Sequence, residues 1–167
     1  CQPCQPVAIA SNESKAQRPW FEAYPPPKNL QSKTLTREEL RQWILDGQKP
    51  GKDFLLVDVR RDDHEGGTIR DTINLPAQSV YPSIPTLYVL FKAAGIKKVI
   101  WTCTTSRKRG NHVAGWFTDF IQGKGDSDIE SYALFEGVLG WATAGREFTD
   151  LMEEYDEEVW RREYSQH

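Results

Sequence analysis

Cysteine is scarce in this sequence and long apolar runs are absent, and each absence excludes a class of protein. The 167 residues contain three cysteines, Cys1, Cys4 and Cys103. Because this count is odd and only Cys103 lies in the body of the chain, a disulfide framework is excluded. No apolar run is long enough to span a bilayer, and the N-terminus lacks the basic and apolar blocks of a secretory signal. The sequence therefore predicts a cytoplasmic protein with no membrane partner.

A strong excess of one charge is absent as well. The formal net charge is −3 at pH 7, so no global feature predicts a nucleic-acid partner or binding to an anionic membrane surface. Hydrophobic residues make up 38% of the chain and charged residues 27%, and this balance is that of a soluble globular protein. The length suits one domain with its own core.

Residues 1–29 differ in composition from the remainder of the chain. This segment is polar and rich in proline, so it is predicted to be a mobile N-terminal tail without its own core. Trp20, Phe21 and Tyr24 are candidates for holding the end of the tail against the domain, which is predicted to span residues 30–160. The stretch Cys1-Gln2-Pro3-Cys4 has the spacing of half a metal site, but no second half follows, so no metal site is predicted.

Strand and helix signals alternate along the predicted domain. A capping box at Thr36 begins a helix that Gly47 ends. Apolar runs predict strands at residues 54–59, 73–76, 98–102 and 132–135. Further helices are expected at residues 84–94 and 110–122, and two more up to Trp160, the second of which carries Phe148, Leu151 and Tyr155. This alternation predicts a single α/β domain whose mostly parallel sheet is flanked by helices.

The decisive stretch is Cys103-Thr104-Thr105-Ser106-Arg107-Lys108-Arg109-Gly110. It connects a buried strand to the N-terminus of a helix, at the edge of the sheet where α/β proteins bind their ligands. Backbone N–H groups of such a loop can face inward and bind an anion, and the helix dipole adds positive potential there. The loop is therefore predicted to bind a tetrahedral oxyanion.

Cys103 and Arg109 are the predicted catalytic residues. The positive field of the loop favours the thiolate of Cys103, which is the nucleophilic form. Arg109 can offer a fork of donors to two oxygens of an oxyanion. An inert buried thiol is the alternative for Cys103, but the spacing Cys-x5-Arg before a helix favours the catalytic interpretation. The predicted oxyanion-binding residues are Thr104, Thr105, Ser106, Arg107, Lys108 and Gly110.

Polar residues that follow the first buried strand are expected to support this loop. Asp58 and Arg60 close the strand, and they are predicted to fix its end beside the loop by hydrogen bonds. His64 is expected to be structural, and the side chain of His112 is expected to face solvent or to pack rather than to act as a base. The candidates for a general acid, which are expected to be only solvated, are Asp62, Asp63 and Glu65.

The sequence resembles the rhodanese-like superfamily over roughly residues 36–145. Similarity to fungal rhodanese-like proteins commonly labelled arsenate reductases is most detailed in the stretch from Asp63 to Pro85 and in Ala114–Phe117. The resemblance implies a parallel sheet flanked by helices, with a catalytic Cys103 in a cradle of backbone amides. The stretches that carry it are Asp53–Arg60, His64–Ile69, Ile73–Pro76, Val99–Cys103 with the loop that follows, and Leu134–Trp141.

The resemblance implies one of three chemistries. Sulfurtransferases carry a persulfide on the cysteine, cell-cycle dual-specificity phosphatases form a cysteinyl phosphate, and the related arsenate reductases attack arsenate. The last two groups have the Cys-x5-Arg spacing that separates Cys103 from Arg109. This sequence departs from them at Thr102, where they usually have His, and at the loop positions Thr104, Thr105 and Lys108, where the fungal relatives often have small residues.

The sequence is interpreted as an arsenate reductase or phosphatase-like enzyme for a small tetrahedral oxyanion or a phosphorylated substrate. No bound cofactor is expected, and the resemblance implies an external thiol, glutathione or glutaredoxin, as reductant and redox partner. A thiosulfate-type sulfurtransferase with a persulfide on Cys103 is the alternative. A non-catalytic anion-binding or protein-interaction module is the second alternative, and the presence of both Cys103 and Arg109 argues against it.

Overall fold

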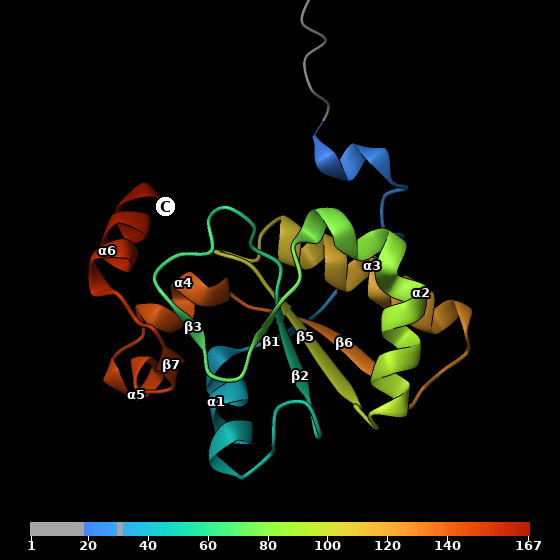
Figure 1. The fold of residues 1–167 in the computed structure, drawn as a ribbon, viewed down its shortest axis with the longest axis horizontal. Helices are drawn as coiled ribbons and strands as arrows, with labels where there is room; N and C mark the ends of the chain where they lie inside the picture. The colour runs from blue at the N-terminus through green and yellow to red at the C-terminus, as the bar shows by residue number, and fades with distance from the viewer. Residues whose placement is uncertain (1–18, 30–31) are drawn as a thin grey trace, which may run out of the picture.

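A computed structural model describes residues 19–29 and 32–167, and its centre is one parallel β-sheet (Figure 1). The five strands of this sheet, in spatial order, are β1 (Lys33–Leu35), β6 (Glu130–Leu134), β5 (Lys98–Thr102), β2 (Leu55–Asp58) and β4 (Ile73–Asn74). Every pairing between neighbours is parallel. The predicted α/β fold class is therefore confirmed.

Helices cover both faces of the sheet (Figure 1). On one face lie α2 (Ala77–Ala93) and α3 (Arg109–Gly123), and on the other lie α1 (Arg37–Leu45), α4 (Gly137–Ala142), α5 (Arg146–Thr149) and α6 (Glu157–Gln166). The short strands β3 (Thr68–Ile69) and β7 (Met152–Glu153) form a separate antiparallel pair. In the part of the chain that the structure describes, no helix is long and apolar enough to cross a membrane.

Strand β2 shows why the central strands have continuous apolar sequences. Successive side chains of a strand point to opposite faces of the sheet. Leu55 and Val57 enter the core under α2 and α3, whereas Phe54 and Leu56 enter the core on the face of α1 and α4. Both faces are buried, so both sets of positions must be apolar.

Helix α2 begins earlier than the sequence predicted. It was expected from residue 84, but it starts at Ala77 and contains Pro82 and Pro85. Proline lacks the N–H that a helix interior uses, so neither residue can donate the usual helical hydrogen bond. Burial of Val80 and Ile84 against the sheet offsets the lost hydrogen bonds, because tertiary packing supplies most of the stability of such a helix.

The C-terminal region differs more from the prediction. Phe148 lies in α5, but Leu151 and Tyr155 are not helical, and α6 continues to Gln166, past the predicted end of the domain at residue 160. Met152 instead pairs with Ile69 in the antiparallel pair. This pairing joins segments that are distant in sequence, so the local periodicity contained no sign of it.

The end of the predicted tail packs against α3. The side-chain N–H of Trp116 donates to the carbonyl of Pro25 at 2.9 Å, and the backbone N–H of Lys28 donates to Asp119 at 2.7 Å. The rings of Tyr24 and Tyr81 stack 4.6 Å apart. The boundary at residue 30 stays a prediction, and Cys1, Cys4 and Leu30 lie outside the described residues.

Gly115 in α3 permits this close approach. A Cβ atom at this position would lie 2.7 Å from the carbonyl oxygen of Asn29 and 2.9 Å from Pro27. We therefore expect Gly115→Ala to destabilise the protein by about 1–3 kcal/mol, measured by urea unfolding. Gly123→Ala in the same helix meets no atom within 4 Å and should stabilise by up to about 1 kcal/mol. Equal effects of the two variants would contradict this account of the contact.

Candidate active site

Cys103 follows directly after β5, at the carboxyl edge of the sheet. The register pairs Asp58 of β2 with Thr102 of β5, and the N–H of Val59 donates to the carbonyl of Thr102 at 2.7 Å. Helix α3 begins at Arg109. The predicted loop therefore connects a central strand to a helix N-terminus. Cys103 lies at the base of this loop and is only 3% exposed.

Two reciprocal hydrogen bonds brace the loop from within. The N–H of Ser106 donates to Sγ of Cys103 at 3.1 Å, and the N–H of Cys103 donates to Oγ of Ser106 at 3.2 Å. Ser106 has a φ of 55°, an uncommon left-handed conformation for a non-glycine residue. The buried hydroxyl of Thr102 lies 3.4 Å from Oγ of Ser106, so this threonine packs beneath the loop. A backbone amide of the loop thus faces the sulfur.

Helix α4 holds the loop from outside through its N-terminal amides. The N–H of Val138 donates to the carbonyl of Cys103 at 3.0 Å, and the N–H of Leu139 donates to that of Thr104 at 2.9 Å. In a trans peptide the N–H points away from the carbonyl. Binding these two carbonyls therefore turns the N–H groups of Thr104 and Thr105 away from α4.

Gly137 makes this contact with α4 possible, and the sequence reasoning did not assign it a role. Its φ is +61°, and an added Cβ atom would clash with the carbonyls of Cys103 and Thr104. The left-handed φ is a conformation that glycine adopts without cost. The only sequence signal was its place in Leu134–Trp141, one of the stretches that resemble rhodanese-like proteins.

The side chains of the predicted oxyanion-binding residues differ in their environments. Those of Thr104 and Thr105 are half-buried, and those of Arg107 and Lys108 extend into solvent. Gly110 lies close under the loop, where an added Cβ atom would be 3.0 Å from Oγ of Ser106. The absence of a Cβ atom at Gly110 lets the helix begin this close to the loop, whereas oxyanion binding by the loop stays a prediction.

Arg109 forms a bidentate ion pair with Asp63, from the segment between β2 and β3. Its Nη1 lies 2.8 Å from Oδ1 and its Nη2 lies 2.5 Å from Oδ2. Oδ2 also accepts from the hydroxyl of Thr104 at 3.1 Å. The hydrogen bond from Arg109 holds the pKa of Asp63 well below its ordinary range, and partial burial opposes this effect only in part. The expectation that Asp63 is only solvated was wrong.

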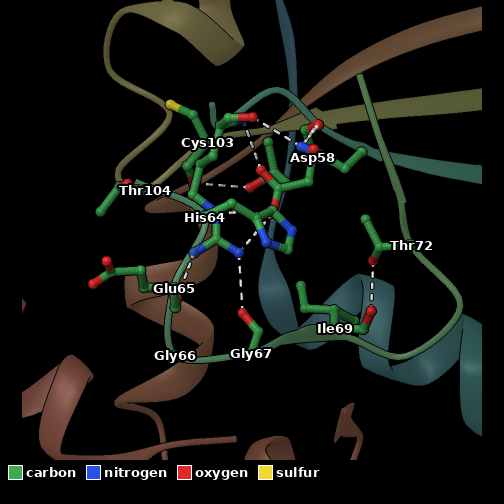
Figure 2. A network of polar contacts seen from close by, with 12 residues as sticks. Asp58, His64, Glu65, Gly66, Gly67, Ile69, Thr72, Cys103 and Thr104 are labelled. Atoms are coloured by element: carbon green, nitrogen blue, oxygen red, sulfur yellow. Dashed lines mark hydrogen bonds and ion pairs between the residues drawn. The ribbon is translucent and has the colours of Figure 1, made fainter. Parts of the chain in front are cut away.

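Asp58 and Arg60 form a buried ion pair, with side chains 0% and 1% exposed. The carboxylate accepts from the backbone N–H of Arg60 at 3.0 Å and from its Nε at 2.8 Å. The guanidinium also donates to the carbonyls of Glu65 at 2.9 Å and Gly67 at 3.0 Å. Figure 2 shows Asp58, Glu65 and Gly67 gathered in this network beside Cys103. The pair therefore shapes the segment that carries Asp63.

The two histidines lie where they support structure. Nε2 of His64 is 3.6 Å from Oδ2 of Asp58, so it borders the buried ion pair (Figure 2). The ring of His112 packs against Phe21 at 5.2 Å and Trp116 at 5.7 Å. In the described part of the chain, neither imidazole forms a hydrogen bond with the sulfur of Cys103, in keeping with the expectation that neither reacts.

The buried pair yields a stability prediction. Arg60→Met would leave the carboxylate of Asp58 buried without its counter-charge, and we expect a loss of about 3–5 kcal/mol in the free energy of unfolding, measured with urea. Arg61→Met is the matched control, because Arg61 and Asp62 form only an exposed ion pair at 3.6 Å. The control should change stability by no more than about 0.5 kcal/mol. A small effect of Arg60→Met on the free energy of unfolding would contradict the proposed importance of the buried Asp58–Arg60 pair.

No family model matches the chain. The chain is 33% identical over 120 residues to Arsenical-resistance protein 2 of Saccharomyces cerevisiae, which covers 68% of this chain and 90% of that protein.

Solved structures share the fold. Yeast Ygr203w, described as a protein tyrosine phosphatase of the rhodanese family, is 24% identical, with a TM-score of 0.65 over 78% of this chain and 97% of its own. The As-Sb reductase of Leishmania major is 20% identical, with a TM-score of 0.64 over 81% of this chain and 99% of its own. At these identities the likeness shows the fold alone. The identity to the yeast protein goes further: the chain belongs to the rhodanese-like family that includes yeast Arsenical-resistance protein 2.

Proposed function

We propose that the protein is a cysteine-dependent oxyanion enzyme that reduces arsenate. The proposal rests on the loop that begins at Cys103. In this loop the amide of Ser106 faces the sulfur of Cys103, and Arg109 lies at the other end of the loop. The similarity to a yeast protein named for arsenical resistance supports arsenate as the substrate.

The loop has the parts that attack on a tetrahedral oxyanion requires. Cys103 is the nucleophile at the base of the loop. The N–H groups of residues 104–110 and the guanidinium of Arg109 stabilise negative charge on the oxyanion in the transition state. Because α4 and Ser106 already hold the loop in shape, little reorganisation is needed when the anion binds.

The proposed reaction needs an external thiol, for which glutathione or a glutaredoxin is suitable. The thiolate of Cys103 bonds to arsenic, and one arsenate oxygen leaves as water. The external thiolate then attacks the sulfur of Cys103, the sulfur–arsenic bond breaks, and arsenic keeps the electron pair and leaves as arsenite. Arsenic(V) gains two electrons, and the two thiols lose them as they form a mixed disulfide. A second external thiol restores Cys103 by disulfide exchange.

The substrate class is tested by assaying three reactions side by side: arsenate with glutathione, an aryl phosphate, and thiosulfate with cyanide. We expect arsenate reduction to be the fastest, because the Cys-x5-Arg loop suits a phosphate-like anion and the yeast relative is named for arsenical resistance. A faster aryl phosphate reaction would assign the loop to a phosphatase. A thiosulfate activity above both would overturn the proposal in favour of a sulfurtransferase.

The role of the thiol is tested by Cys103→Ser. The serine hydroxyl can still accept from the N–H of Ser106, so we expect the fold to persist while activity falls to background, because a hydroxyl is a far weaker nucleophile than a thiolate. Circular dichroism and urea unfolding check the fold. A Cys1→Ser, Cys4→Ser double variant is the control and should keep its activity with an excess of external thiol. Substantial turnover by Cys103→Ser would refute the assignment.

A further inference from the structure

Asp63 touches both ends of the loop. Its carboxylate accepts from the hydroxyl of Thr104, next to Cys103, and from the guanidinium of Arg109 at the far end. Its Oδ1 also accepts from the backbone N–H of Arg61 at 3.1 Å. The side chain is 44% exposed and that of Arg109 is 23% exposed. A carboxylate bound at several points beside an expected anion site requires a physical explanation.

The contact leaves one edge of the guanidinium available. A guanidinium carries five N–H donors in one plane. Asp63 takes one N–H from Nη1 and one from Nη2, which together form the end of the group. The side edge, formed by Nε–H and the second N–H of Nη2, is also a fork that fits two oxygens of one anion. Among the described residues, Nε–H of Arg109 donates to no hydrogen-bond acceptor.

The ionisation of both groups agrees with a lasting contact. The pKa of Asp63 lies well below its ordinary range because Arg109 hydrogen-bonds to it, so Asp63 is ionised at neutral pH and cannot act as a general acid. The pKa of Arg109 is raised, mainly because its guanidinium donates hydrogen bonds to Asp63 and further by the charge of Asp63, while partial burial opposes this effect.

We propose that Asp63 is a positioning residue for Arg109: it holds the guanidinium by its end, so that the side edge is presented to the oxyanion bound over Cys103. This inference rests on the proposed function. A long arginine side chain has many rotamers, and fixing one before the substrate arrives reduces the entropy lost in reaching the transition state. The opposing possibility is that Asp63 merely competes with the anion for Arg109.

Kinetics of three variants distinguish positioning from competition. Asp63→Asn removes the charge, Asp63→Glu retains it on a longer arm, and Asp62→Asn is the matched control, since the Asp62 side chain is 92% exposed. With arsenate and glutathione, we expect Asp63→Asn to lower kcat/KM by up to about 10²-fold, mainly through kcat. Asp63→Glu should recover part of this loss and Asp62→Asn should match the wild type. A lower KM with an unchanged kcat in Asp63→Asn would establish competition and overturn the proposal.

A titration with inorganic phosphate tests the same inference without turnover, so it stays informative if the chain does not reduce arsenate. The readout is the side-chain Nε–H resonance of Arg109 in ¹H–¹⁵N spectra. In the wild type we expect phosphate to shift this resonance, and in Asp63→Asn we expect weaker phosphate binding and a smaller shift. Phosphate binding to Asp63→Asn that equals or exceeds wild-type binding would refute the positioning role.

Discussion

The buried ion pair between Asp58 and Arg60 is the interaction on which the geometry of the site depends. A charge taken out of water is costly unless a partner and hydrogen bonds compensate for it. Here the carboxylate and the guanidinium lie 2.7 Å apart, and the remaining donors of Arg60 reach the carbonyls of Glu65 and Gly67. The requirement to satisfy these charges thus fixes both the end of β2 and the path of the segment after it.

That path matters because it brings Asp63 to the loop that follows Cys103. The indole N–H of Trp160 in α6 donates to the carbonyl of Gly66 at 2.6 Å, and the guanidinium of Arg60 lies 5.4 Å from the Trp160 ring. The C-terminal helix therefore helps to hold the same segment. The ion pair between Asp63 and Arg109 thus depends on the buried Asp58–Arg60 pair and on α6.

The loop is shaped by amides on two sides. Backbone N–H groups of α4 donate to the carbonyls of Cys103 and Thr104. Inside the loop, Ser106 and Cys103 form two hydrogen bonds with each other. Each bond fixes the direction of a peptide group, and the direction of its N–H is decided at the same time. The result is a loop whose donors are arranged before any anion arrives, which is the condition under which electrostatic stabilisation of a transition state is most effective.

How much of this could be predicted from the sequence differs between the fold and the site. The parallel sheet and the strand that ends just before Cys103 were predicted correctly, because apolar runs are local properties of the chain. The support of the strand end by Asp58 and Arg60 was also expected, since the two residues are neighbours in sequence and end a buried strand. The early start of α2 was missed, because prolines are unusual inside a helix and the packing that supports this helix is tertiary.

The sequence by itself determined the fold class, the nucleophile candidate and the length of the loop. Only the tertiary structure decided which groups surround that loop. Asp63 and Arg109 are 46 residues apart, and a carboxylate in a charged segment is usually solvated, so no local pattern marks it as a partner of the loop arginine. The bonds from α4 to the loop depend likewise on how a later helix packs against the sheet, because contacts between distant segments are set by the burial of the whole core and not by neighbouring residues.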